Sequence, residues 1–151
     1  MAPPTSFRAA LLAGLFVAGL GAAAPALAQS MERARVAQAR GDLRAAQIEY
    51  RNAVRAEPNS APARAALAAV SLDLGDGDTA EKEARAALER GFDPAAGTAM
   101  LLRSYLLQNR GRDLLRDFPI PAEPARAAVG GQIAAARAVA ALGLDDRPGA
   151  R

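Results

Sequence analysis

Four glycines divide the chain at nearly equal intervals, and this spacing constrains the fold more than any other feature. Gly41, Gly75, Gly111 and Gly143 each follow a run rich in alanine and leucine, and successive glycines are 34, 36 and 32 residues apart. A repeat of about this length is typical of stacked helix pairs, in which each pair buries its apolar side against the next. The spacing therefore predicts a row of helical hairpins.

The segment between Gly41 and Pro58 shows one unit of the repeat most clearly. A helix is expected after the glycine, and the proline ends it because proline lacks the N–H that a helix interior needs. Small and aromatic residues recur within it at steps of three and four, so they share one helix face. With a first helix expected over 30–40, the segment forms a hairpin. The residues of the shared face are Ala46, Tyr50 and Ala53.

The second unit repeats this pattern closely. Ala80 and Ala87 stand where Ala46 and Ala53 stand in the first unit, on a helix expected over 79–90. Glycines and aspartates fill the preceding turn, as in the first unit. Because small residues let helix axes approach closely, a second hairpin of the same shape is expected.

The later units keep the pattern less well. A long first helix is expected from Pro94 to Asn109, but its partner over 112–118 is short and stops at a proline. A last alanine-rich helix is expected over 122–142, weakened by two adjacent glycines that cost about 1 kcal/mol each relative to alanine. The predicted units are 29–60, 61–94, 95–121 and 122–144, and a disordered tail over 145–151 leaves the array truncated.

The composition predicts an all-α fold. Hydrophobic residues make up 51% of the chain but aromatic residues only 4%, and alanine supplies much of the difference. Alanine has the highest helix propensity, whereas the β-branched residues that favour sheets are scarce. Helices therefore have to form the core.

Residues 1–28 have the layout of a secretory signal peptide. A basic head ending at Arg8 precedes an apolar stretch over 9–24, and an Ala-Leu-Ala triplet offers cleavage between Ala28 and Gln29. The apolar stretch is shorter than the roughly 20 residues that span a bilayer comfortably, although an uncleaved anchor is the alternative. We therefore expect a periplasmic or secreted protein. It is not expected to be a lipoprotein, because the chain has no cysteine to accept a lipid.

The charged residues do not point to nucleic acid. The chain has 19 lysines and arginines against 16 acidic residues, a formal charge of +3, and the two signs are interleaved. A nucleic-acid-binding surface would gather the basic residues on one run or face. A solvated helix surface explains this pattern.

Residue types needed for catalysis or metal binding are missing or wrongly spaced. Without cysteine or histidine there is no thiol nucleophile, no thiolate metal site and no imidazole to activate a serine. The acidic cluster Asp73, Asp76 and Asp78 does not have the spacing of a calcium-binding loop and is interpreted as a turn with a helix cap. We predict no enzyme activity, no cofactor and no metal.

The hairpin pattern resembles the tetratricopeptide repeat. The early small residue of that repeat's second helix matches Ala46, its aromatic residue matches Tyr50, its next small residue matches Ala53 and its closing proline matches Pro58. The tryptophan usual in the first helix is absent. The resemblance implies a right-handed α-solenoid of about three and a half hairpins, preceded by the signal-peptide helix.

In tetratricopeptide arrays, the first helix of each pair lines an inner groove. The resemblance carries this role to a few positions in each unit, where an extended peptide or a polymer could be held. Tyr105 is the preferred anchor because a rigid aromatic side chain binds at little entropic cost; each position could instead be an ordinary solvated residue. The candidate groove residues are Arg35, Gln38, Leu72, Asp73, Tyr105, Gln108 and Arg137.

The stretch 34–118 is similar to the opening repeats of large exported tetratricopeptide proteins that accompany exosortase and PEP-CTERM sorting systems. The similarity is carried by the Gly-Asp-Leu turn at Gly41, by Asp-Leu-Gly-Asp-Gly from Asp73 and by Arg-Gly-Phe-Asp-Pro from Arg90. Those proteins are associated with extracellular polysaccharide and biofilm matrix. They are usually much longer and often lipidated, whereas this chain has no cysteine.

Three functional classes follow. The first is a non-catalytic exported scaffold that binds a protein or peptide in the cell envelope, in exopolysaccharide export or PEP-CTERM sorting. The second is a carbohydrate-associated envelope subunit, which would favour more aromatic residues than two tyrosines and four phenylalanines. The third is the N-terminal fragment of a larger tetratricopeptide-containing enzyme or assembly protein. No nucleic acid is expected as a partner, and a membrane only through an uncleaved anchor.

Overall fold

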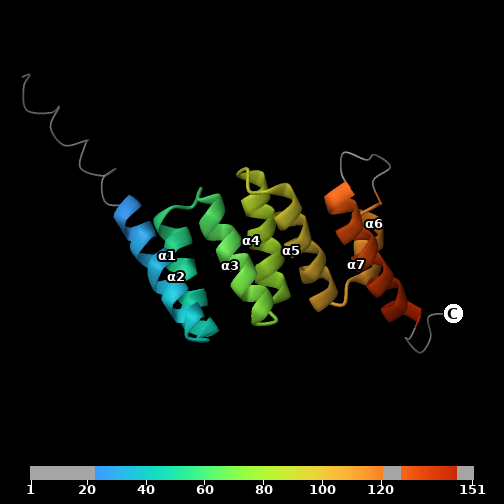
Figure 1. The fold of residues 1–151 in the computed structure, drawn as a ribbon, viewed down its shortest axis with the longest axis horizontal. Helices are drawn as coiled ribbons and strands as arrows, with labels where there is room; N and C mark the ends of the chain where they lie inside the picture. Colours follow the sequence, from blue (N-terminus) through green and yellow to red (C-terminus); the bar gives the residue numbers. More distant parts are fainter. Residues whose placement is uncertain (1–22, 121–126, 146–151) are drawn as a thin grey trace, which may run out of the picture.

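The protein is all-α over the residues that the computed structural model describes, 23–120 and 127–145, and these ranges contain seven helices and no strand. Figure 1 shows the helices side by side in a row from α1 to α7. This confirms the predicted fold class. The helices are α1 (Ala23–Ala39), α2 (Leu43–Ala56), α3 (Ala61–Asp73), α4 (Gly77–Glu89), α5 (Pro94–Leu107), α6 (Gly111–Asp117) and α7 (Ala127–Asp145).

Helix contacts follow the order of the chain. Helices α1 to α6 form three hairpins, α1–α2, α3–α4 and α5–α6, and each hairpin packs on the next through α2–α3 and α4–α5 contacts. First helices of adjacent units also touch, since α5 contacts both α3 and α7. The fold is therefore a row in which each unit is held by its neighbours.

The same turn joins the two helices of all three hairpins. Its central residue has a left-handed backbone, with φ of 78° at Gly41, 77° at Gly75 and 55° at Asn109. The residue after each donates its N–H across the turn to the carbonyl of Ala37, Ser71 and Tyr105, respectively. Left-handed backbone suits glycine and, next best, asparagine. These turn residues lie 34 residues apart in both intervals.

Two of the four glycines taken as turn markers are not turn residues. Gly111 is the first residue of α6, and Asn109 takes the turn position instead. Gly143 keeps the 34-residue spacing from Asn109 but lies inside α7, which continues to Asp145. The uneven sequence spacing of 34, 36 and 32 therefore came from reading the third turn two residues too late.

Side-chain caps set most of the helix starts. Asp42, Asp76 and Asp93 accept hydrogen bonds from the third residue after each, at 3.0, 3.1 and 2.7 Å, which satisfies one free N–H of each helix end. Because Asp76 is the cap, α4 begins at Gly77, two residues before the predicted start. Arg110 precedes α6 without a capping bond. The short α6 predicted from the following proline is confirmed.

Small residues form the contacts between helices. The predicted repeat residues are buried: Ala46, Ala53, Ala80 and Ala87 have no exposed surface, and Tyr50 is 4% exposed. Pro58, as predicted, follows the end of α2 in an exposed turn. Alanine faces bury little apolar area each, so the core depends on many close contacts rather than on a few large side chains.

Helix α1 starts at Ala23, seven residues before the predicted start at Ser30. The predicted cleavage point after Ala28 therefore lies within it. The side chains of Met31 and Ala34 pack against α2, whereas Ala28 is exposed. Residues 1–22 of the predicted signal peptide and residues 146–151 of the predicted tail lie outside the described residues. No helix of the described ranges is both long enough and apolar enough to cross a bilayer.

Helix α7 is rotated relative to α3 and α5. Leu101 and Ser104 of α5 are buried, but the residues 34 positions later, Ala135 and Ala138, are exposed. Instead, residues two positions earlier in each case face the third hairpin. These buried residues are Ile133, Ala136 and Ala140.

Candidate functional site

The first candidate surface is the row of first helices, where several predicted groove residues are exposed. Arg35 has 64% of its side chain exposed, and its only described ion pair, with Glu32, is loose at 3.6 Å. Gln38 is exposed and accepts a hydrogen bond from the Tyr50 hydroxyl at 3.0 Å. The carboxylate of Asp73 on α3 is also exposed.

Two predicted groove residues are not accessible, and two more are held by the fold. Leu72 is 4% exposed and Tyr105 is 1% exposed, so neither can anchor a ligand. Gln108 donates to the Gly77 carbonyl at 3.0 Å and also to a carboxylate of α4. The guanidinium of Arg137 donates to the last carbonyls of α6, including that of Phe118 at 3.0 Å.

The error at Tyr105 has the same cause as the misplaced turn. With Asn109 as the turn residue, the position equivalent to Arg35 in the third unit is Arg103, which follows it by two periods of 34. Arg103 has 61% of its side chain exposed and lies 3.7 Å from the Asp73 carboxylate. Sequence reasoning missed Arg103; recognising asparagine as a left-handed turn residue would have found it.

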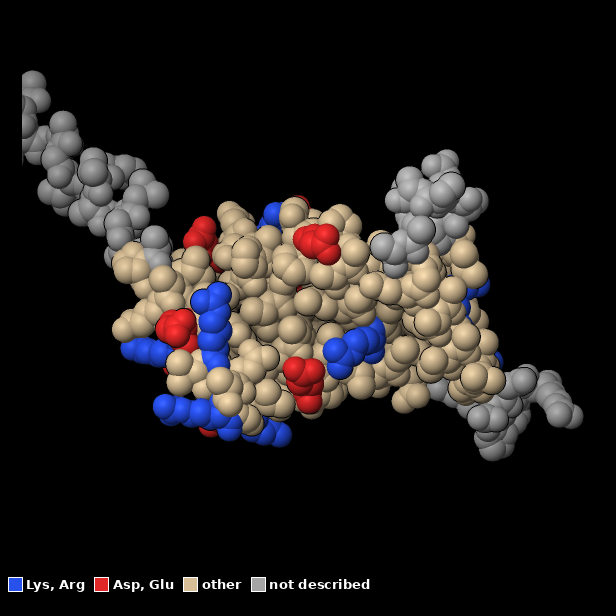
Figure 2. All heavy atoms as spheres, in the orientation of Figure 1, with Lys and Arg blue, Asp and Glu red and all other residues tan. Residues whose placement is uncertain are grey.

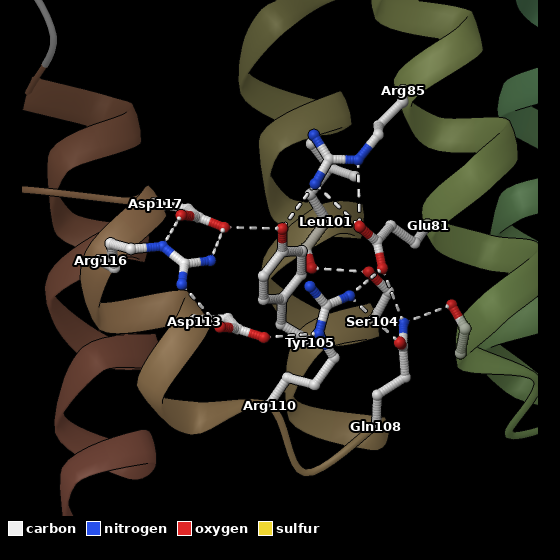
Figure 3. Close-up of polar contacts among 11 residues, drawn as sticks. Glu81, Arg85, Leu101, Ser104, Tyr105, Gln108, Arg110, Asp113, Arg116 and Asp117 are labelled. Carbon is white, nitrogen blue, oxygen red and sulfur yellow. Dashed lines mark hydrogen bonds and ion pairs between the residues drawn. The ribbon is translucent and has the colours of Figure 1, made fainter.

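Tyr105 instead lies at the centre of a polar cluster that joins α4, α5 and α6 (Figure 3). Its hydroxyl donates to Asp117 at 3.1 Å and accepts from Arg85. Its ring meets Phe118 edge to face, with centroids 5.4 Å apart, and the Arg110 guanidinium lies over the ring at 4.4 Å. These contacts fix the tyrosine on every side.

Glu81 collects the cations of the cluster. One carboxylate oxygen accepts from Arg85 at 2.8 Å, and the other accepts from Arg110 at 2.7 Å and Gln108 at 3.0 Å. Partial burial would by itself raise the pKa of this carboxyl. The hydrogen bonds and the two guanidinium charges outweigh burial, so the pKa of Glu81 lies below its ordinary value of 4.5.

The two acids of α6 complete the cluster. The hydrogen bond from Arg110, at 2.9 Å, lowers the pKa of Asp113, and the hydrogen bond from Arg116, at 2.7 Å, lowers the pKa of Asp117. Burial raises the pKa of Tyr105. The carboxylates are therefore ionised and the phenol protonated near neutral pH, a state that favours fixed ion pairs over proton transfer.

A related cluster joins the first two hairpins. The Gln47 amide donates to the Ser71 hydroxyl at 3.1 Å and to Asp76 at 3.4 Å, and Arg51 lies 3.9 Å from Asp76. Adding 34 to each number gives Glu81, Tyr105, Arg110 and Arg85. We call these four-residue sets the first joint and the second joint. Neither described joint leaves a buried side-chain polar atom without a partner, so both hold hairpins together.

The second candidate surface is a groove between α5 and α7. Its volume is about 320 Å³, and Arg103 and Gln132 supply its polar atoms. Figure 2 shows one face of the molecule, on which charged side chains gather over the α1 and α2 end while the surface over α7 is almost uncharged. The apolar lining comprises Ala99, Leu102 and Leu106 of α5 and Ala135, Ala136 and Val139 of α7.

No set of three or more acidic residues that could hold a metal ion occurs among residues 23–120 and 127–145. Comparison with known proteins adds no assignment, since no protein-family model, curated protein or solved structure matches the chain.

Proposed function

We propose that the protein is a non-catalytic, exported helical-repeat scaffold of the tetratricopeptide type, a right-handed α-solenoid that binds a protein or peptide partner in the cell envelope. The observation that carries this proposal is the equal spacing of the three hairpins, whose turn residues Gly41, Gly75 and Asn109 are 34 residues apart with the same backbone geometry. Equal units set first helices in register and repeat one surface along the row.

Charged side chains on that surface are available to a partner. Arg35, Asp73 and Arg103 lie on the first helices α1, α3 and α5, and 64%, 43% and 61% of these side chains are exposed. Their ion pairs, at 3.6 and 3.7 Å, contribute little to stability and exchange readily for bonds to a ligand. A polar segment carrying both signs of charge fits this surface.

A carbohydrate-binding role has less support. Sugar-binding surfaces of this kind use exposed aromatic rings, but Tyr50 and Tyr105 are 4% and 1% exposed. A link to exopolysaccharide export or to exosortase and PEP-CTERM sorting rests on the sequence resemblance alone and stays part of the proposal.

Affinity capture from envelope extract tests the scaffold function. The triple variant Arg35→Ala, Asp73→Ala and Arg103→Ala removes two positive charges and one negative charge from the first helices. A matched control, Arg44→Ala, Lys82→Ala and Glu89→Ala, removes the same charges from exposed positions on the second helices. We expect wild type and control to retain a common protein that the first variant loses by at least about tenfold. Equal capture by both variants would refute binding through the first helices.

Export is tested separately by mass spectrometry of the mature protein. Cleavage after Ala28 would leave Gln29 at the N-terminus and keep the α1 residues Met31 and Ala34 that pack on α2. We expect the recovered chain to begin at Gln29. An intact chain recovered from the cytoplasm would contradict the signal-peptide part of the proposal.

A further inference from the structure

The two ends of the helix row have different surfaces. The α1–α2 end carries charged residues on its outer side, among them Glu32, Arg33 and Arg40. The α5–α7 end does not: from Val129 to Leu144 every exposed residue of α7 is uncharged. A surface without charge loses little solvation when it is covered, so it favours burial against another apolar surface.

Large exposed apolar side chains also gather at the α5–α7 end. Val139 is 56% exposed and Leu142 is 67% exposed on α7, and Leu107 at the end of α5 is 45% exposed. The groove between α5 and α7 runs beside them, and Val139 forms part of its wall. This end therefore offers an apolar hollow and projecting apolar side chains on the same helix.

The one basic side chain in the middle of α7 is turned away from this surface. Arg137 is half-buried and donates to the carbonyls of Leu115 and Phe118 at the end of α6. Its charge is thereby neutralised within the molecule rather than presented on the outer side of α7. Two such surfaces can face each other without like charges meeting.

We propose that the α5–α7 end binds a second copy of this chain, so that α7 of each copy lies along the α5–α7 groove of the other. A two-fold axis requires one patch that is complementary to itself, and a hollow and a projection on the same helix meet that condition. The charged α1–α2 end does not match this surface, so tail-to-tail pairing is favoured over a head-to-tail filament. Pairing closes the assembly at two copies.

Sedimentation velocity of the full chain over a range of concentrations tests the dimer. The variant pair Val139→Arg and Leu142→Arg places charges on the proposed interface, and the control pair Val36→Arg and Ile48→Arg places them at 40% and 57% exposed apolar positions of the opposite end. We expect wild type and control to dimerise and the α7 pair to dissociate at least about tenfold more readily. A monomeric wild type, or equal dissociation of both pairs, would overturn the proposal.

A thiol probe gives a second readout that does not depend on weakening the interface. The chain has no cysteine, so Leu142→Cys and Ile48→Cys each introduce a single exposed thiol. A thiol near a two-fold axis has a high effective concentration relative to its copy, so Leu142→Cys should form the crosslinked dimer about tenfold faster than Ile48→Cys under mild oxidation. Equal rates would show that the copies meet only by random collision.

Discussion

The two joints occupy the same backbone positions but solve the packing of hairpins with different chemistry. In the first joint, the neutral amide of Gln47 faces the carboxylate of Asp76; in the second, the carboxylate of Glu81 faces the guanidinium of Arg110. The acidic partner has moved from one side of the joint to the other. The pairs keep opposite or compatible polarity, which shows that the position, rather than the residue, is fixed by the repeat.

The second joint is also the more extensive one. Arg51 of the first joint has one carboxylate within reach, at 3.9 Å. Its equivalent, Arg85, contacts both Glu81 and the Tyr105 hydroxyl, and Tyr105 in turn reaches Asp117 of α6. A tyrosine in the place of a serine extends the joint into a third helix. The short α6, which lacks a capping side chain, is thus held by side-chain contacts.

Removing Tyr105 should have the largest effect on this comparison. Tyr105→Ala leaves a cavity and strips partners from Arg85, so we expect a loss of about 3–5 kcal/mol in the free energy of unfolding. Ser71→Ala, at the equivalent position of the first joint, removes one hydrogen bond and should cost about 1 kcal/mol. Urea denaturation followed by circular dichroism measures both. Equal losses would mean that the second joint is no stronger than the first.

Exchanging the charge pattern of the second joint tests whether the positions are equivalent. Arg110→Asp places a carboxylate beside Glu81 and should cost about 2–3 kcal/mol. Adding Glu81→Gln recreates the amide–carboxylate pair of the first joint, so at least about half of the loss should be recovered. The Asp side chain would also supply the cap that α6 lacks.

A double-mutant cycle with the single variant Glu81→Gln isolates the coupling between these positions. We expect a coupling free energy of at least about 1 kcal/mol. If the two single losses simply add, Glu81 and Arg110 do not form the pair that Gln47 and Asp76 form in the first joint.

Acid should weaken both joints. Burial raises the pKa of Asp76, but hydrogen bonds from Thr79 and Gln47 and the charge of Arg51 outweigh it, so the pKa is lowered, as it is at Glu81. A lowered folded-state pKa adds stability above the unfolded-state value and loses it as pH falls through the folded-state value.

The free energy of unfolding should therefore fall as pH decreases below about 4.5, the ordinary value for Glu81. Glu81→Gln should make that fall shallower by less than about 1 kcal/mol, because the network is only partly shielded from solvent. Urea midpoints measured at several pH values between neutral and acidic conditions test this. A variant that loses stability with acid as steeply as wild type would exclude Glu81 as a contributor.

The sequence predicted the helices well because their signals are local. Alternating small residues such as Ala46 and Ala53, a capping aspartate at Asp42 and the proline at Pro58 each act within a few residues, and the hairpins follow from them. The error in the third unit came from treating glycine as the only left-handed residue. Asn109 carries the same backbone conformation, with φ of 55°.

The candidate site was harder to predict because it depends on contacts between units. Exposed Arg35 and Asp73 lie where they were expected, but Leu72 and Tyr105 are buried by neighbouring hairpins. The second joint draws residues from three helices that are up to 36 positions apart, from Glu81 to Asp117. No periodicity within one helix encodes such a cluster, and the rotation of α7 likewise depends on how it packs against α6.

The smallest predicted effect concerns the turns beside the two joints. Gly75 has φ of 77°, and a Cβ added there would meet nothing within 4 Å, so only its backbone conformation opposes a side chain. Gly75→Ala should cost about 1 kcal/mol, whereas Gly75→Asn, which copies the third turn, should cost about 0.5 kcal/mol or less. Gly131→Ala, in open space on α7, is the control and should gain about 0.5–1 kcal/mol.

Thermal unfolding of the three variants ranks these effects. If Gly75→Asn is as unstable as Gly75→Ala, then asparagine is tolerated at the third turn only because of its own surroundings there, and the two turns are not interchangeable. If asparagine is tolerated at both turns, the repeat fixes the left-handed conformation itself. The joints would then differ only in the side chains that face one another across them.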